Sequence, residues 1–157
     1  MTIWLLHFKL WFSEVVLCPK KLIKEYEVIL REKIQQLLDP YDSSQTECDG
    51  MTRICHTVLT NHGIDHQPII GVLTQHHQHI EPHFWIDLPS GERIDYRAKM
   101  WLKGGNIPHG IFHPQDFPDV IYTGEPIELD VLSPTLFEIL TLRFDWEKFK
   151  QHETPDA

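Results

Sequence analysis

The chain has 157 residues, of which 41% are apolar and 24% charged, with 8 glycines and 11 prolines. This composition is typical of a globular protein and excludes the collagen-like, coiled-coil and disordered classes. Its 14 basic and 23 acidic residues give a net charge of −9, which argues against nucleic acid as a partner. We therefore expect a single domain over residues 1–157 with one hydrophobic core.

The N-terminal segment is rich in large apolar side chains, yet it does not have the pattern of a membrane span. Lys9 and Glu14 interrupt its apolar stretch, residues 3–17, which is also too short to cross a bilayer. It also lacks the charged start and the cleavage site of a signal peptide. Three cysteines without framework spacing favour a reducing compartment. We expect a cytoplasmic protein, with contact of this segment with a membrane surface as the less favoured alternative.

Two helices are predicted in the N-terminal third of the chain. Apolar residues recur at steps of three and four over residues 20–38, which indicates an amphipathic helix that a proline ends. A second apolar stripe covers residues 51–62. The helix that carries it is expected to begin near Glu47 or Cys48 and to stop at Gly63, which can adopt the left-handed backbone of a helix end.

The middle of the chain predicts strands. Residues 67–73 are typical of a buried strand, and residues 84–88 alternate between apolar and polar after a histidine-rich link. Turn residues at 89–91 lead to a returning strand at 93–96. The order of helices followed by strands indicates an α+β fold in which N-terminal helices pack on an antiparallel sheet.

The C-terminal part has weaker signals. Glycines and prolines after Met100 indicate a long irregular connection. Short strands are expected at 120–122 and 127–131, followed by a short helix at 136–142. The tail from Gln151 is expected to be loose.

Cys48 is the candidate nucleophile. A thiol in the first turn of a helix lies beside free backbone N–H groups and the positive end of the helix dipole, which favour its thiolate. Cys55 lies two turns further on, inside the apolar stripe, and is expected to be a small buried hydrophobic residue. His56 does not activate Cys55, because adjacent helical side chains point about 100° apart.

His83 and Asp95 are the candidate base and its orienting acid. In a hairpin with an odd-length turn, their even separation in sequence puts both side chains on the same face of the sheet, opposite or one diagonal step apart. Asp87 shares that face but lies too far along the strand to orient the ring, and Glu81 is the only local competitor. The alternative is a hairpin on which both residues are merely exposed.

These residues together resemble the transglutaminase-like cysteine enzymes. The resemblance covers residues 47–96 and depends on order and spacing, since each motif alone is weak. Its motifs are Cys48-Asp49-Gly50-Met51-Thr52 through Leu59 to Gly63-Ile64, then Ile69-Ile70-Gly71, then His83-Phe84-Trp85, and finally Gly91 followed by Asp95. The chain departs from many members of the family at Tyr96, where they have proline.

The resemblance implies a papain-related core and a Cys-His-Asp catalytic triad made of Cys48, His83 and Asp95. Such an enzyme forms a thioester on the cysteine and works as an amide or ester hydrolase, a deamidase or a transamidase, without a cofactor. The expected substrate is a peptide, a protein or a small amide or ester. Gln45 is the side chain that could help to bind the oxyanion. The candidate substrate-binding residues are Trp85, Tyr96, Trp101 and His109.

Four segments follow from this assignment: a helical part at 1–46, the catalytic core at 47–96, a substrate-shaping part at 97–150 and the tail at 151–157. Two other functions stay open. The chain could be a non-catalytic protein-binding module with the same fold. The histidine-rich run at 76–79 could also bind zinc, but it lacks the spacing of a metal site, so we expect no metal.

Overall fold

The computed structural model describes residues 19–142. The expectations for the apolar segment 3–17 and for the tail from Gln151 concern residues outside this range. The chain divides into two compact units, one ending at Ile34 and the other beginning at Gln35. The helix α2, Pro19–Leu38, confirms the first predicted helix. A short 3₁₀ turn follows at Asp39–Tyr41.

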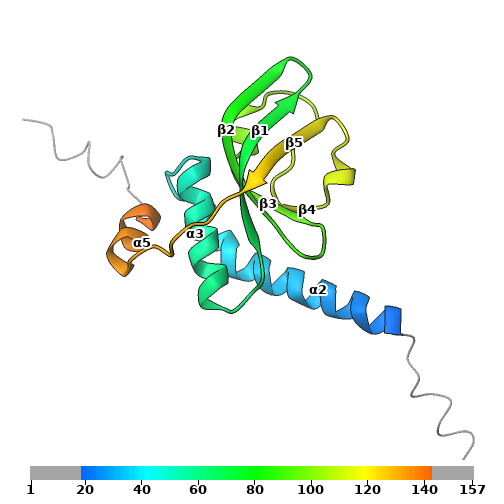
Figure 1. Ribbon diagram of the computed structural model, residues 1–157, viewed down its shortest axis with the longest axis vertical. Coiled ribbons are helices and arrows are strands. Elements are labelled where there is room, and N and C mark those ends of the chain that lie inside the picture. Colours follow the sequence, from blue (N-terminus) through cyan, green and yellow to red (C-terminus); the bar gives the residue numbers. More distant parts are fainter. Residues whose placement is uncertain (1–18, 143–157) are drawn as a thin grey trace, which may run out of the picture. The chain divides into compact units, whose positions relative to one another are not determined.

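The second unit contains a five-stranded sheet in which every pair of neighbours is antiparallel (Figure 1). The strand order is β4-β3-β2-β1-β5. The sheet and the helices confirm the α+β class. The strands are β1 (Gln67–Gln75), β2 (Gln78–Asp87), β3 (Arg93–Asp95), β4 (Gly110–Phe112) and β5 (Val120–Pro126).

The histidine-rich segment is not the link that its composition predicts. It forms the tip of a tight hairpin, in which Gln75 pairs with Gln78 and only two residues turn the chain. The first of these, His76, has a φ of 53°, which is the left-handed backbone that short hairpin turns require. The polar side chains therefore mark the exposed end of a hairpin, and β2 begins six residues earlier than expected.

The C-terminal part differs from expectation in two ways. The stretch after Met100 that is expected to be irregular contains the strand β4, and the helix α4 (Ala98–Trp101), which the sequence does not predict, ends where that stretch begins. The two short strands expected around Gly124 are one strand, β5, and residues 127–131 form no strand. The helix α5, Pro134–Thr141, is confirmed and is capped by the Ser133 side chain.

Glycine is required where β1 pairs closely with β5. Gly71 pairs with Gly124, and a Cβ atom on Gly124 would lie 2.4 Å from the Ile70 oxygen and 2.6 Å from the Trp85 ring. Only a residue without a side chain lets the two strands and the indole approach this closely.

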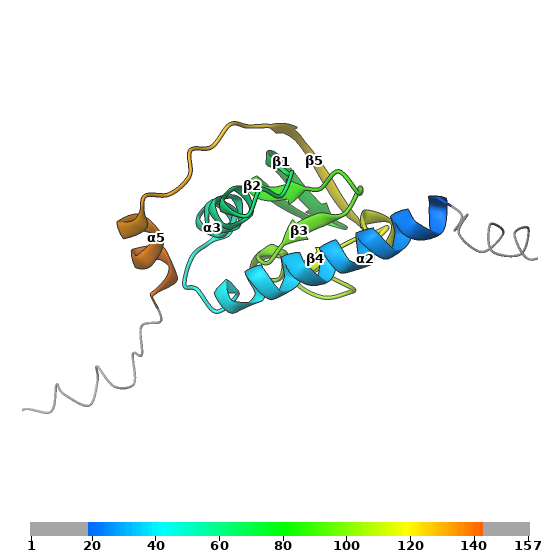
Figure 2. The ribbon, with the colours of Figure 1, turned by 90° about the horizontal axis from the view of Figure 1, so that it is seen from below.

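The helix α3, Cys48–Asn61, confirms the second predicted helix and packs against β2 (Figure 2). It begins at the expected residue, and Gly63 after its end has a φ of 63°. Its apolar stripe is buried, so the helix holds its first turn firmly beside the sheet.

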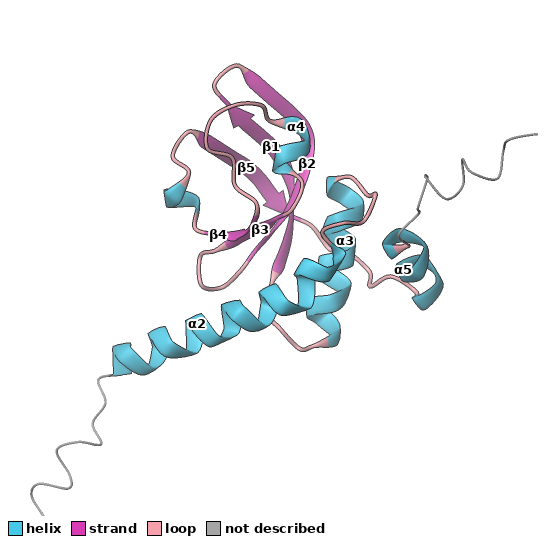
Figure 3. Ribbon diagram, turned by 180° about the vertical axis from the view of Figure 1, so that it is seen from behind, coloured by secondary structure: helices cyan, strands magenta, loops and turns pink. Residues whose placement is uncertain are grey.

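The sheet is strongly curled. Tyr122 on β5 and Phe112 on β4 come from opposite edges of the sheet, yet their rings lie 6.0 Å apart. The side chains inside the curl form a hydrophobic cluster of Leu73, Ala98, Leu102 and Val120. Figure 3 shows α4 beside the hairpin of β1 and β2, and two of these cluster residues belong to α4 or follow it directly.

Candidate active site

Cys48 is the first residue of α3 and is buried, with 7% of its surface exposed. The first backbone hydrogen bond of the helix runs from the Met51 N–H to the Glu47 oxygen, and the Glu47 side chain does not cap the helix. The N–H groups of the first turn therefore have no partner within the helix. The Cys48 sulfur lies at the positive end of the α3 dipole, as predicted.

The loop before Cys48 passes very close to the first turn of the helix. A Cβ atom on Gly50 would lie 2.8 Å from the Thr46 Cβ. Glycine at this position therefore allows the loop to fold back over the helix start, which positions Cys48.

His83 and Asp95 are brought together as predicted. The His83 Nε2 lies 2.7 Å from the Asp95 Oδ2, and both side chains are buried. The register places Ile86 opposite Ile94, so continuing it puts Asp95 opposite Trp85 and one diagonal step from His83. Of the two arrangements that the sequence left open, the diagonal one is present.

Asp95 is held by four donors. Its Oδ2 accepts hydrogen bonds from His83 and, at 2.9 Å, from the Tyr122 hydroxyl. Its Oδ1 accepts from the backbone N–H groups of Arg97 at 2.7 Å and Ala98 at 3.0 Å. Since the two backbone donors fix one oxygen, the other oxygen must face the His83 ring.

The remaining ring nitrogen of His83, Nδ1, is the one left for Cys48. It is buried and makes no hydrogen bond of good geometry with the described residues. Cys48 nevertheless contributes to raising the pKa of the ring, and long or poorly aligned hydrogen bonds are common in catalytic sites without substrate. Burial lowers the pKa of His83, but hydrogen bonds to Asp95 and Cys48 and the charges of both outweigh it and raise the pKa to about 9. The ring therefore carries its proton at neutral pH.

Cys55 has a different environment from Cys48. It is buried in the apolar stripe of α3, and this burial raises the pKa of its thiol to about 12. Cys55 is therefore protonated at neutral pH and is not a nucleophile. Both thiols are free and line one small cavity. The cavity volume of about 10 Å³ is about the size of one water molecule.

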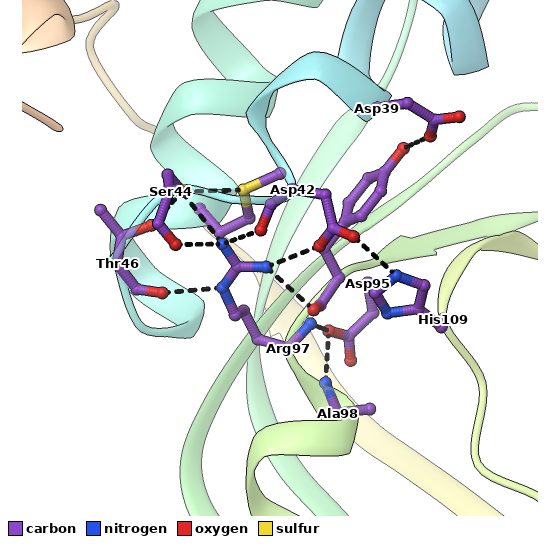
Figure 4. Close-up of polar contacts among 10 residues, drawn as sticks. Asp39, Asp42, Ser44, Thr46, Asp95, Arg97, Ala98 and His109 are labelled. Atoms are coloured by element: carbon purple, nitrogen blue, oxygen red, sulfur yellow. Dashed lines mark hydrogen bonds and ion pairs between the residues drawn. The ribbon is translucent and has the colours of Figure 1, made fainter. Parts of the chain in front are cut away.

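A buried arginine fastens the loop before Cys48 to the end of β3 (Figure 4). The Arg97 guanidinium donates to the backbone oxygens of Asp42, Ser44 and Thr46 at 3.1, 3.0 and 2.7 Å. It also donates to the Asp42 carboxylate, the Ser44 hydroxyl and the Tyr96 oxygen. Because Arg97 lies two residues after Asp95, one side chain connects the acid of the site with the loop that leads to the thiol.

The other predicted site residues occupy varied positions. Gln45 is exposed. Trp85 is buried, and its ring stacks 6.2 Å from the His83 ring. Tyr96 is buried, and its hydroxyl donates to Asp39 at 2.7 Å. Trp85 and Tyr96 thus support the site from within and present no surface to a substrate in this conformation.

The two candidates beyond Tyr96 are more accessible. Trp101, at the end of α4, is 37% exposed. The His109 Nε2 lies 3.0 Å from the Asp42 carboxylate, on the loop that Arg97 binds (Figure 4). Of the candidate substrate-binding residues, His109 is therefore the accessible one that contacts the loop leading to Cys48.

The two carboxylates that could have competed with Asp95 have partners elsewhere. Glu81 is exposed and pairs with His79 at 3.1 Å. Asp87 accepts hydrogen bonds from the Trp85 indole and from Arg93. Asp95 is therefore the carboxylate that orients His83.

Over residues 19–142, no cluster of three or more histidine, cysteine, aspartate and glutamate side chains has the arrangement of a metal site. In the same range, every helix is too short or too polar to cross a membrane.

Two site residues are not predicted from the sequence. Arg97 follows directly on the segment that resembles the transglutaminase-like enzymes, and a single arginine there gives no sign that it will be buried. Tyr122 lies on a strand 27 residues after Asp95, and only the curl of the sheet brings it to the carboxylate. A strand pattern cannot show such a contact.

Comparison with models of known protein families, with curated proteins and with solved structures gives no match for this chain.

Proposed function

We propose that this chain is a cysteine-dependent acyl-transfer enzyme of the transglutaminase-like type, with a papain-related core. The observation that supports this most strongly is the buried His83, which binds Asp95 through one ring nitrogen and has the other available to Cys48 at a helix N-terminus. A nucleophile, a base and an orienting acid in this order form the minimal set for acyl transfer through a thioester.

In the proposed reaction the Cys48 thiolate attacks the carbonyl carbon of an amide or ester. The carbonyl electron pair moves to the oxygen, which the free N–H of Cys48 stabilises. When the pair returns, the bond to the leaving group breaks, and the His83 imidazolium gives its proton to that group. The neutral ring then takes a proton from water or an amine, whose oxygen or nitrogen attacks the thioester carbon. The carbon–sulfur bond breaks and the acyl product leaves, which restores the Cys48 thiolate and the His83 imidazolium.

The proposed substrate is a peptide, a protein or a small amide or ester, and the reaction needs no cofactor. Hydrolysis, deamidation and transamidation share the first half of this scheme and differ only in the group that resolves the thioester. A reducing compartment such as the cytoplasm would keep the thiol of Cys48 free.

One observation favours a second candidate function, a non-catalytic protein-binding module with the same fold. Cys48 is only 7% exposed, and its cavity has no room for a substrate. As an enzyme, the chain must open this site to admit an acyl group, whereas a binding module need not do so.

The first test is to trap the acyl-enzyme. Incubation with p-nitrophenyl acetate at neutral pH should release nitrophenolate in a burst and add one acetyl group to Cys48, as located by peptide mass spectrometry. Cys55→Ala should behave like the wild type, because burial keeps the Cys55 thiol protonated. With an amide substrate, whose leaving amine needs a proton, acylation should instead slow as the pH rises through about 9, because His83 then loses the proton that it gives to the amine.

Absence of the adduct, or equal acetylation of Cys48→Ala and the wild type, would contradict the enzyme proposal and favour the binding module.

A further inference from the structure

Tyr122 packs against the His83 end of the candidate triad and against two of its neighbours, Trp85 and Arg93. Its ring centroid lies 6.1 Å from that of His83 and 5.1 Å from that of Trp85. The Arg93 guanidinium carbon lies 5.0 Å from the Tyr122 ring. Contacts from β2 and β3 thus hold the ring and set the direction of its hydroxyl.

That direction is toward the acid of the site. The Tyr122 hydroxyl donates to the Asp95 Oδ2 at 2.9 Å, and the same oxygen lies 2.7 Å from the His83 Nε2. The two donors therefore compete for the electron density of one carboxylate oxygen.

We propose that Tyr122 is a positioning residue of the triad. It fixes the orientation of the Asp95 carboxylate and limits how strongly Asp95 retains the proton on His83. This inference rests on the proposed function and goes beyond it, because it assigns the proton balance of the triad to a residue outside it.

The phenol is suited to act only as a donor. Burial and the charge of Asp95 raise the pKa of Tyr122, so the hydroxyl keeps its proton over the range in which His83 titrates. Removing the hydroxyl leaves the Asp95 Oδ2 with His83 as its sole donor among the described residues. The carboxylate then stabilises the imidazolium more strongly, and His83 gives up its proton less readily.

The test compares Tyr122→Phe with Tyr96→Phe. Tyr96 is a matched control, because its hydroxyl also donates to a carboxylate, that of Asp39, which makes no hydrogen bond with His83 within residues 19–142. Both substitutions keep the aromatic ring and remove one buried hydrogen bond. They should therefore cost similar stability in urea unfolding.

Only Tyr122→Phe should change the proton on His83. We expect the midpoint of the His83 NMR titration to rise by roughly one pH unit, and the acylation of Cys48 by an amide substrate, whose leaving amine takes the His83 proton, to slow by roughly tenfold near pH 7. Tyr96→Phe should leave the His83 midpoint where it is in the wild type.

A His83 midpoint unchanged in Tyr122→Phe, or shifted equally in both variants, would overturn the inference and leave Tyr122 a packing residue. The titration does not depend on catalysis. If the wild type forms no acyl-enzyme, the proposed function fails, while the NMR result still decides whether Tyr122 controls the His83 proton.

Discussion

Asp95→Asn should slow acylation of Cys48 by up to about 10⁴-fold, the loss that follows when the acid of a Ser-His-Asp triad becomes an amide. The structure gives the reason. The backbone N–H groups of Arg97 and Ala98 hold one side-chain oxygen of residue 95, so the amide nitrogen of the variant must face the His83 Nε2. An amide N–H there requires an unprotonated Nε2, and the ring proton moves to Nδ1, the nitrogen needed for Cys48.

Two other carboxylates serve as controls for this prediction. Glu81→Gln changes an exposed side chain that pairs with His79, and Asp87→Asn changes one that binds Trp85 and Arg93. Neither should lower the acylation rate by more than a few fold. A full rate in Asp95→Asn, or a loss in Glu81→Gln of the same size, would show that the orienting residue is misassigned.

Arg97→Met should lower the free energy of unfolding by about 3–5 kcal/mol, the typical cost of breaking a buried charged network. The substitution leaves the backbone oxygens of Ser44 and Thr46 without their donor and removes one of the two partners of the Asp42 carboxylate, the other being His109. Urea unfolding followed by tryptophan fluorescence measures this loss.

Arg97→Lys should fall between the wild type and Arg97→Met, because one ammonium group has three donors and cannot reproduce the planar fork of a guanidinium. Arg53→Met, on the partly exposed side of α3, removes the same charge and should cost about 1 kcal/mol or less. If Arg97→Met costs no more than this control, Arg97 does not hold the loop before Cys48.

The features that the sequence predicts are those set by local pattern. The start of α3 at Cys48 follows from an apolar stripe and a glycine end. The pairing of His83 with Asp95 follows from the two-residue period of a strand and a short turn, so the candidate triad can be found from spacing alone. Neither result depends on contacts between distant strands.

The rest depends on the curvature of the sheet, which no local pattern carries. A flat sheet would leave the face of His83 and Asp95 exposed. The alternation of apolar and polar residues along the strand is equally consistent with such an exposed hairpin. The curl instead encloses Trp85 and brings Tyr122 onto Asp95. The glycines at 71 and 124 that permit the close approach of β1 and β5 give no sign of this role before the strands are paired.

The central claim is that Cys48 and His83 share one proton, and an NMR titration of the His83 imidazole in the wild type and in Cys48→Ala tests it most directly. The wild-type ring should titrate near pH 9, and the midpoint should fall in Cys48→Ala, because the hydrogen bond and the charge of Cys48 both raise the pKa of His83. A wild-type midpoint at or below 6.5, or the same midpoint in both proteins, would contradict the claim.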